Sequence, residues 1–328
     1  MPKIDELFCS NLPTFPANDG RLILVTGANG YVGGRLIPEL IARGYKVRIM
    51  VRKESSDYKE KWPEVDIVVV DALNSLSLED ALKGVHTVYY FIHSLGLGYS
   101  KFELVDIKIA TNFRLAAENQ NVKRIIYLGG LGDTNSTLSR HLENRIKVGQ
   151  ILSEGKIPVT VLRAAMIIGS GSASYEILIN LVNNTPIFFI PKWAKTKCQP
   201  ISIRGVIMYL VGVMEIEETA GKSFDIGCDD ILTYEDKLRV LAKLLGKKRF
   251  FFPGLISNSA LYAFIVRILT PVSGPIIRVL VEGCKNEVIC QNNDIKAYID
   301  IELLSFKDAI YRANLIEKNI LKSSERKI

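Results

Sequence analysis

The chain has 328 residues, of which 48% are apolar and 23% are charged, and 42 basic against 35 acidic side chains give a formal net charge of +7. These proportions are those of an ordinary globular protein and exclude a disordered or collagen-like chain. The positive excess suits anionic ligands such as phosphates, but it is too small to indicate nucleic-acid binding. The length predicts two domains, or one large α/β domain with an appended lobe.

The five cysteines are scattered and form no C-x-x-C pair, so we expect neither a disulfide framework nor a metal site. This cysteine usage fits a reducing, cytoplasmic location best. Residues 1–20 carry charges and prolines where a signal peptide needs an apolar segment, and we expect a flexible leader there.

From residue 21 onward, short apolar runs alternate with helical patterns, which predicts an α/β fold with a doubly wound parallel sheet of the Rossmann type over residues 21–165. The predicted strands are 22–25, 46–51, 66–70, 87–92, 124–128 and 159–162, and the predicted helices are 31–43, a short one around 78–82, 102–119 and 141–154.

The regular alternation loosens after residue 164, and we expect a smaller mixed lobe over 166–320 that completes the fold and covers a substrate cleft. Helices are predicted at 175–182, 204–214 and 234–245, with strands at 187–190, 200–203 and 223–226. Residues 321–328 are polar and basic, and we expect a frayed tail there.

The longest apolar stretch, 255–280, is interrupted by two arginines and two prolines, so it cannot cross a bilayer as one helix. It predicts two amphipathic helices joined at Thr270-Pro271. We favour packing of these helices on the core or on a partner subunit. The alternative is contact of 255–285 with a membrane surface, with Arg267, Arg278 and Lys285 facing lipid phosphates.

Three glycines with G-x-x-G-x-x-G spacing lie between the first predicted strand and the first predicted helix. Gly27 permits a tight turn, Gly30 lets a pyrophosphate approach the backbone, and Gly33 lets helix and strand pack closely. The N–H groups and positive dipole end of the helix then face the phosphates. The turn therefore predicts a dinucleotide-binding site, whose residues we take as Gly27, Asn29, Gly30, Tyr31, Val32 and Gly33.

The residues that end the second strand bear on which dinucleotide binds. An acidic residue here would bind the ribose hydroxyls of NAD, but the chain has Arg52-Lys53. A guanidinium binds phosphate in a bidentate manner, so we predict NADP, with NAD as the alternative if Arg52 is only a solvated surface charge.

Two further predicted strand ends carry polar residues at the same edge of the sheet. Asp71-Ala72 would contact the adenine, or Asp71 would cap the helix that begins near Ser75. His93 would contact the ribose or nicotinamide, or it is a structural residue.

The chain resembles the short-chain dehydrogenase/reductase superfamily, and within it the atypical, extended branch of NmrA-like NAD(P)-binding proteins. The resemblance rests on TGANGYVG at 26–33, Arg52, Asp71-Ala72 and the segment VDIKIATNFRLAAENQNVKRIIYL at 105–128. It implies strand order 3-2-1-4-5-6-7, with the cofactor across the carboxyl edge of the sheet and the C-terminal lobe over the substrate cleft.

The catalytic pattern of that superfamily is broken in this chain. Gly129-Gly130 stand where the resemblance implies a serine, and His141-Leu-Glu-Asn-Arg145 stands in place of Tyr-x-x-x-Lys. The helical Asn position of the branch reads as Asp106. His141 is the candidate general acid and Arg145 the candidate ribose ligand; the alternative is that both are ordinary polar residues of a helix.

Several other polar residues have both a structural and a functional interpretation. Arg163 pairs with a buried carboxylate or anchors substrate, and we favour the pairing. The remaining candidates for the cleft are Tyr99, Ser170, Ser172, Tyr175, Trp193 and Gln199; of these, the residues at 170–175 would otherwise begin a helix.

Two functions of different kinds follow from an intact dinucleotide motif beside a broken catalytic pattern. The first is an NADP-dependent oxidoreductase, or an epimerase with a tightly held cofactor, acting on an unidentified small molecule. The second, which the resemblance implies, is a non-catalytic NAD(P)H redox sensor or an assembly or accessory factor of a respiratory complex, which would have a protein partner.

Overall fold

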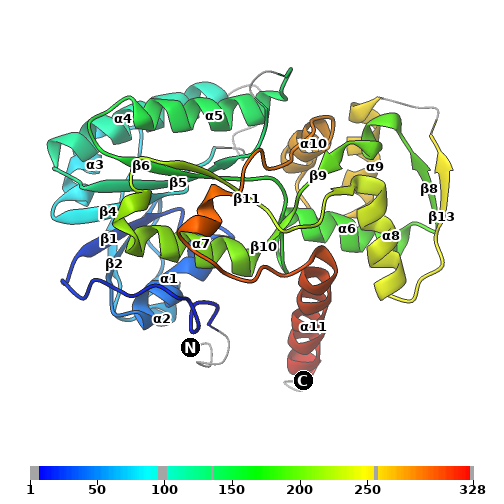
Figure 1. The fold of residues 1–328 in the computed structure, drawn as a ribbon, viewed down its shortest axis with the longest axis horizontal. Helices are drawn as coiled ribbons and strands as arrows, with labels where there is room; N and C mark the ends of the chain where they lie inside the picture. The colour runs from blue at the N-terminus through cyan, green and yellow to red at the C-terminus, as the bar shows by residue number, and fades with distance from the viewer. Residues whose placement is uncertain (1–6, 95–101, 134–135, 255–257, 326–328) are drawn as a thin grey trace.

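A computed structural model describes residues 7–94, 102–133, 136–254 and 258–325, and it has a parallel seven-stranded sheet at its centre (Figure 1). The strand order β11-β6-β5-β4-β1-β2-β3 is the order implied by the resemblance, so the predicted fold class is confirmed. The strands are β1 (Leu22–Thr26), β2 (Lys46–Val51), β3 (Asp66–Val69), β4 (Val85–Tyr90), β5 (Arg124–Gly130), β6 (Val159–Ala164) and β11 (Ser223–Ile226).

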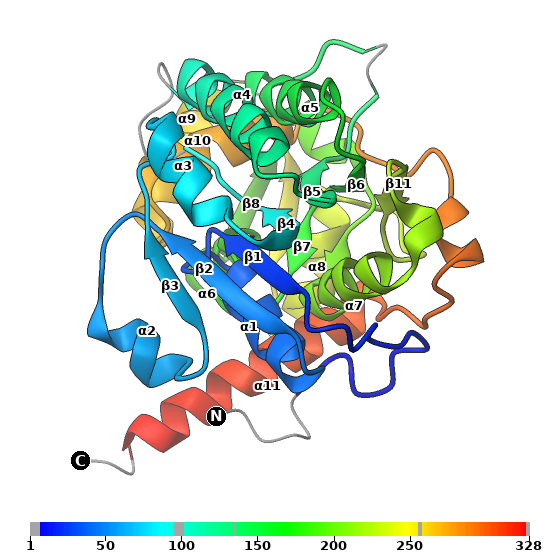
Figure 2. The same cartoon turned by 90° about the vertical axis from the view of Figure 1, so that its left-hand side faces the viewer.

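Helices cover both faces of this sheet (Figures 1 and 2). One face carries α3 (Ser75–Leu82), α4 (Phe102–Asn119) and α5 (Arg140–Ser153), and the other carries α1 (Gly33–Ala42) and α7 (Ile203–Glu215). Each face buries its own apolar cluster, as expected for strands that are covered on both sides. A short polar helix, α2 (Ser56–Lys61), connects β2 to β3 and was not predicted.

The C-terminal lobe extends from one end of the sheet (Figure 1). It contains the helices α6 (Ala173–Asn184), α8 (Tyr234–Leu244), α9 (Ser259–Leu269) and α10 (Gly274–Gly283), and the paired strands β8 (Ile187–Ile190) and β13 (Phe250–Pro253). The shorter strands β7 (Ile167–Ile168), β9 (Lys197–Cys198), β10 (Ile201–Ser202) and β12 (Leu232–Thr233) link the lobe to the sheet domain. The 3₁₀ turns are Lys192–Lys195, Glu217–Thr219 and Asp294–Ala297.

Two features of the lobe were predicted correctly in kind but not in extent. The apolar stretch does form two helices, and they are separated near Thr270. The strand predicted at 200–203 is shorter, because the Ser202 hydroxyl accepts a hydrogen bond from the Gly205 amide and starts α7 at Ile203. At the end of the described chain, α11 (Phe306–Glu325) includes the first residues of the predicted tail.

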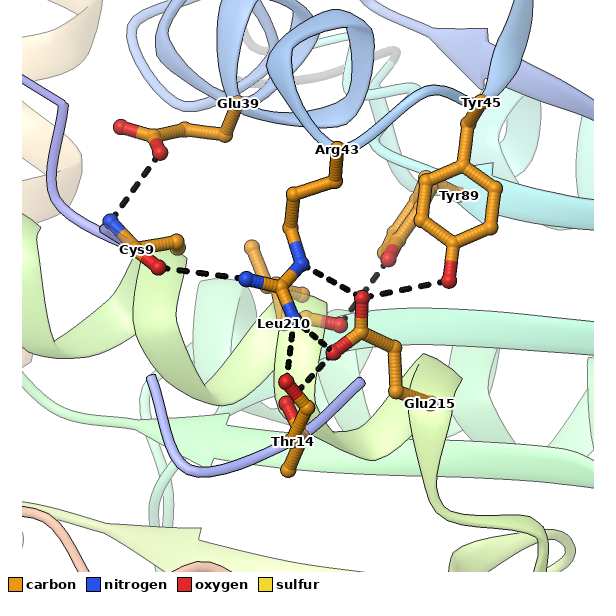
Figure 3. Close-up of polar contacts among 8 residues, drawn as sticks. All are labelled: Cys9, Thr14, Glu39, Arg43, Tyr45, Tyr89, Leu210 and Glu215. Carbon is orange, nitrogen blue, oxygen red and sulfur yellow. Dashed lines mark hydrogen bonds and ion pairs between the residues drawn. The ribbon is translucent and has the colours of Figure 1, made fainter. Parts of the chain in front are cut away.

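The leader predicted to be flexible is packed against α1 and α7 in its described part, residues 7–20 (Figure 3). The Phe8 and Cys9 amides donate to the carboxylate of Glu39, and Cys9 is only 2% exposed. Arg43 donates to the Cys9 carbonyl and to both carboxylate oxygens of Glu215, at 2.6 Å each. Backbone hydrogen bonds to charged side chains therefore hold a segment that has no helical or strand pattern of its own.

We expect Arg43→Leu to lower the free energy of unfolding by about 3 kcal/mol, because it leaves the Glu215 carboxylate, whose side chain is 0% exposed, without its cation. The matched control is Lys83→Ala, which removes a solvent-exposed ion pair with Asp80 and should lower the free energy of unfolding far less than Arg43→Leu does. Urea unfolding of the two variants measures both. Equal losses would contradict the role given to Arg43.

Candidate functional site

The turn between β1 and α1 has the tight geometry that its glycines predict. Gly27 has a φ of +64°, and a Cβ at that position would lie 2.9 Å from the Phe91 carbonyl oxygen at the end of β4. A Cβ on Gly33 would lie 2.5 Å from the Gly27 carbonyl oxygen. Both positions exclude side chains, so the backbone of the turn, the helix and the neighbouring strand approach closely.

No side chain caps the N-terminus of α1, because its N-cap residue is Val32. The Gly34 and Arg35 amides of the first turn bond to the Gly30 and Val32 carbonyls, at 3.0 Å each. Gly30 is exposed. An exposed glycine and the positive end of a helix dipole without a side-chain cap fit a pyrophosphate, which this glycine turn would hold.

The residues predicted to bind the rest of a dinucleotide follow β2 and β3, on the same edge of the sheet as the glycine turn of residues 27–33. Arg52 and Lys53 follow β2 and are exposed. The Tyr58 hydroxyl, from the unpredicted helix α2, accepts a hydrogen bond from the Asn29 side chain. Tyr58 thereby ties α2 to the glycine turn.

Asp71 is exposed at the carboxyl edge of the sheet, and its side chain accepts a hydrogen bond from the Leu73 amide at 3.0 Å. It does not cap α3. Asn74 does so instead, by accepting from the Leu76 and Ser77 amides. The structural alternative weighed for Asp71 is therefore wrong, since the capping residue is Asn74. Ala72 beside it is buried.

A buried carboxylate accepts hydrogen bonds from polar groups of the segment that follows β4 and of α5. Asp106, on α4, is 2% exposed. It accepts hydrogen bonds from His93 Nδ1 at 3.1 Å, the Ser94 amide at 2.8 Å and Asn144 Nδ2 at 2.8 Å. Burial opposes ionisation of Asp106, but these hydrogen bonds outweigh it and lower the pKa of the carboxyl. Asp106 is therefore a carboxylate at neutral pH, and His93 presents Nδ1–H to it.

His93 and His141 lie against each other, with ring centroids 5.1 Å apart and the ring planes tilted by 26°. Burial lowers the pKa of His93 despite its hydrogen bond to Asp106. Burial, the neighbouring His93 and Arg145 lower the pKa of His141 to about 3. Both rings are therefore neutral at pH 7. His93 Nε2 and His141 Nδ1 are buried and have no hydrogen-bond partner among the residues that the structure describes.

Arg145 is held by the protein rather than by solvent. Its Nη2 donates to the Leu128 carbonyl, and its guanidinium lies 4.7 Å from the centre of the Tyr127 ring. The Tyr127 hydroxyl in turn donates to the Arg145 carbonyl at 2.8 Å. His141 does lie in the first turn of α5, as the structural interpretation expects, whereas Arg145 is bound to the Leu128 carbonyl and is not a solvated surface charge. Both side chains line the same cavity.

An apolar cavity of about 810 Å³ begins at this histidine pair and continues into the C-terminal lobe. Its sheet-side wall includes His93, Gly129-Gly130, His141 and Arg145. A Cβ at Gly129 would lie 3.1 Å from the Tyr127 ring and one at Gly130 would lie 3.0 Å from the Leu142 side chain, so neither position readily accommodates the serine that the resemblance implies. The lobe supplies the remaining wall from α6, β8, α8, α9 and α10.

The other candidates divide between wall and framework. Trp193 lines the cavity, whereas Gln199 bonds to the Cys228 carbonyl and the Cys290 amide and serves packing. Arg163 forms an ion pair of 2.6 Å with the buried Asp225, as favoured. The Ser172 hydroxyl caps α6, the structural alternative for that position. Tyr99 lies outside the described residues.

Sequence reasoning missed Asn144 and Tyr58. Asn144 is three residues after His141, so helical spacing puts both on one face of α5, and this signal was available. Nothing near Tyr58 indicates its contact with the glycine turn, because α2 buries none of its residues and so has no apolar pattern.

Comparison with known proteins agrees with this geometry. Residues 27–179 match the family described as NAD(P)H-binding. The chain is 23% identical over 323 residues to the mitochondrial NADH dehydrogenase [ubiquinone] 1 alpha subcomplex subunit 9 of Dictyostelium discoideum, covering 93% of this chain and 84% of that protein.

Two solved structures share the fold. The Citrobacter triphenylmethane reductase, solved with NADP(H), is 20% identical with a TM-score of 0.71, covering 89% of this chain and 99% of that one. The Thermotoga maritima UDP-glucose 4-epimerase, solved with UDP-glucose, is 15% identical with a TM-score of 0.69, covering 92% and 99%.

Residues 27–179, just under half of the chain, are therefore similar to NAD(P)H-binding proteins, and the solved structures share the fold of the chain. In the described part of the chain, every helix is too short or too polar to cross a bilayer.

The low pKa of His141 makes the stability of the protein dependent on pH. The unfolded chain binds a proton at this residue below about pH 6.5, whereas the folded protein does so only near pH 3. Stability is therefore lost as the pH falls from about 6.5, and this residue accounts for about 2 kcal/mol by pH 5.

In His141→Asn, the decrease in unfolding free energy between pH 7 and pH 5 should be smaller by about this amount, measured by urea unfolding at both pH values. The same decrease in both proteins would show that His141 is protonated normally in the folded state.

Proposed function

We propose that this protein is an NADP-dependent oxidoreductase that reduces a carbonyl group beside His93 and His141, without the usual Tyr-x-x-x-Lys pair. The observation that carries the proposal is the position of two neutral, partly buried histidines in the wall of an apolar cavity, on the same sheet edge as the glycine turn. In open α/β sheets of this kind, ligands bind at the carboxyl edge.

A bound dihydronicotinamide supplies the hydride for this reaction. Reduction of a carbonyl takes up that hydride at carbon and a proton at oxygen. With a pKa near 3, His141 does not act as an imidazolium acid at neutral pH. Its role in the proposal is instead to donate a hydrogen bond from the neutral ring to the carbonyl oxygen, while water provides the proton.

The neighbours of the histidines position them for this task. Asp106 fixes the His93 ring through Nδ1, and His93 supports the His141 ring by stacking. Arg145, bound to the Leu128 carbonyl, places its positive charge beside the developing negative charge on oxygen. The apolar wall lowers the local dielectric constant, which strengthens each of these interactions.

Carbonyl reduction is favoured over epimerisation of a sugar nucleotide by the lining of the cavity. The Thermotoga relative was solved with UDP-glucose, a ligand rich in hydroxyls and charge. Here Arg145 is the single acidic or basic side chain among the described residues of the wall, apart from the histidines. Such a wall has few partners for sugar hydroxyls, and unpaired buried hydroxyls are costly.

A second candidate is a non-catalytic, NAD(P)H-binding subunit. It is favoured by the absence of the serine, tyrosine and lysine, and by the full-length similarity to a subunit of NADH dehydrogenase. The first candidate, the oxidoreductase, is proposed to act in the cytoplasm, because the five free cysteines suit a reducing compartment.

The two candidates are separated by titrating the protein with NADPH and NADH, followed by fluorescence, and then assaying cofactor oxidation with quinones and carbonyl compounds. We expect tight binding and turnover. The control is Gly30→Val, whose side chain enters the phosphate cradle from its exposed side and should abolish binding while the protein still unfolds cooperatively. Tight binding without turnover across the panel would favour the non-catalytic subunit.

Arg52→Asp tests the choice of cofactor. We expect the ratio of NADPH to NADH affinity to fall at least tenfold, because the variant removes the proposed 2′-phosphate ligand and adds a carboxylate for the ribose hydroxyls. Arg48→Ala, on the same strand but paired with Asp66, is the control and should leave the ratio unchanged. An unchanged ratio in Arg52→Asp would remove Arg52 from cofactor recognition.

A further inference from the structure

The cavity is much larger than a reacting carbonyl needs. Its volume of about 810 Å³ lies in the upper part of the range of about 300–1,000 Å³ found for ligand pockets. Its wall includes residues of α6, α9 and α10 and extends to residues of β8 and β13. Figure 1 shows β8 and β13 at the outer end of the lobe. The central sheet domain therefore forms the polar end of the cavity, and the C-terminal lobe forms its outer end.

The chemistry of the wall changes along this path. The histidines and Arg145 all belong to the sheet end. The lobe end is built from aliphatic and aromatic side chains, among them Leu178, Val266 and Val281. A ligand that fills the cavity must therefore have one polar end and a long apolar remainder.

The outer end of the cavity is open to the surface. Four large apolar residues both line the cavity and are exposed to solvent: Ile187 at 45%, Phe189 at 62%, Leu261 at 41% and Ile265 at 42%. They lie on β8 and on α9. An apolar rim around an apolar interior is an entrance for a ligand that avoids water, since exposed apolar surface of this kind marks a binding site.

We propose that the cavity binds a lipid with a single long hydrocarbon chain and a carbonyl group at one end, with the carbonyl at His93 and His141 and the chain directed toward β8 and α9. The proposal rests on the proposed function for the fate of the carbonyl. In that reaction the carbonyl π bond breaks, carbon gains the hydride, oxygen gains one proton (H⁺) taken up from the bulk solvent, and NADPH is oxidised to NADP⁺.

Trp193 gives the cavity a probe of its own. Its Nε1–H and the Thr185 hydroxyl are buried polar groups of the wall without a hydrogen-bond partner among the described residues, and the rest of the lobe wall is largely apolar. Trp193 packs edge-on against Tyr262, with ring centroids 5.3 Å apart. Because the chain has two tryptophans and Trp62 lies in the separate core under the sheet, Trp193 is a specific reporter of the cavity.

The test uses methyl ketones from 2-octanone to 2-hexadecanone, each with a bromine at the tail, added to the protein without cofactor. Bromine quenches indole fluorescence on contact, and we expect quenching in the wild type but not in Trp193→Phe. The dissociation constant should fall about two- to fourfold per added methylene until the cavity is full. If Trp193→Phe does not fold, the rise in melting temperature with chain length is measured on the wild type instead.

Two neighbouring variants on α9 supply a matched comparison. Ile265→Asp puts a charge in the entrance and should weaken binding of 2-hexadecanone at least tenfold. Phe264→Asp changes a residue that is similarly exposed, at 55%, but is not part of the wall, and should leave binding of the same ketone in solution unchanged. Equal effects of the two variants would overturn the position of the entrance.

The outcomes for the cavity and for the proposed function are distinguishable. Chain-length-dependent quenching without NADPH oxidation would support the lipid site and reject the reductase. Oxidation of NADPH by short and long ketones with equal KM would reject the lipid site and keep the reductase. Presenting 2-hexadecanone in phosphatidylcholine vesicles distinguishes the source of the lipid: loss of uptake in Phe264→Asp under this condition alone indicates delivery from a bilayer.

Discussion

The arrangement of the polar residues at the sheet end of the cavity depends on the hydrogen bonds that the buried carboxylate of Asp106 accepts. This carboxylate lies on α4, yet it binds the two residues that follow β4 and an asparagine of α5, so one buried charge ties together a strand end and two helices. A buried carboxylate is stable only when its hydrogen bonds are satisfied, which makes the arrangement around it cooperative. The orientation of His93, and through stacking that of His141, follows from it.

The same burial explains why this site differs from a solvated acid–base pair. The rings of His93 and His141 line a cavity with a largely apolar wall, where a second positive charge beside Arg145 is unfavourable. Proton uptake is therefore suppressed, and the site offers neutral donors and acceptors in a medium of low dielectric constant. Hydrogen bonds are stronger in such a medium, which suits recognition of a weakly polar carbonyl more than of a charged group.

How much of the fold the sequence predicts depends on how locally each element is encoded. The central strands and α4 follow from continuous apolar runs and helical spacing, and the bounds of β2, α4 and β11 agree with expectation. The leader escapes this reasoning because Cys9 and Thr14 are buried by contacts with α1 and with Glu215, 201 residues beyond Thr14. Tertiary partners that distant leave no periodicity in the segment itself.

The two halves of the candidate site differ in the same way. The phosphate cradle depends on backbone geometry within residues 27–33, where only glycine satisfies the contacts, so its sequence is constrained and readable. The cavity depends on apolar side chains from five lobe elements, and many apolar residues fill such positions equally well. Substitutions in the cavity wall can therefore change the shape of the cavity without changing the backbone geometry of the glycine turn. This is a physical reason why one cofactor-binding fold serves relatives that act on dyes and sugar nucleotides, and why the chain length of a ligand must be read from the lobe rather than from the motif.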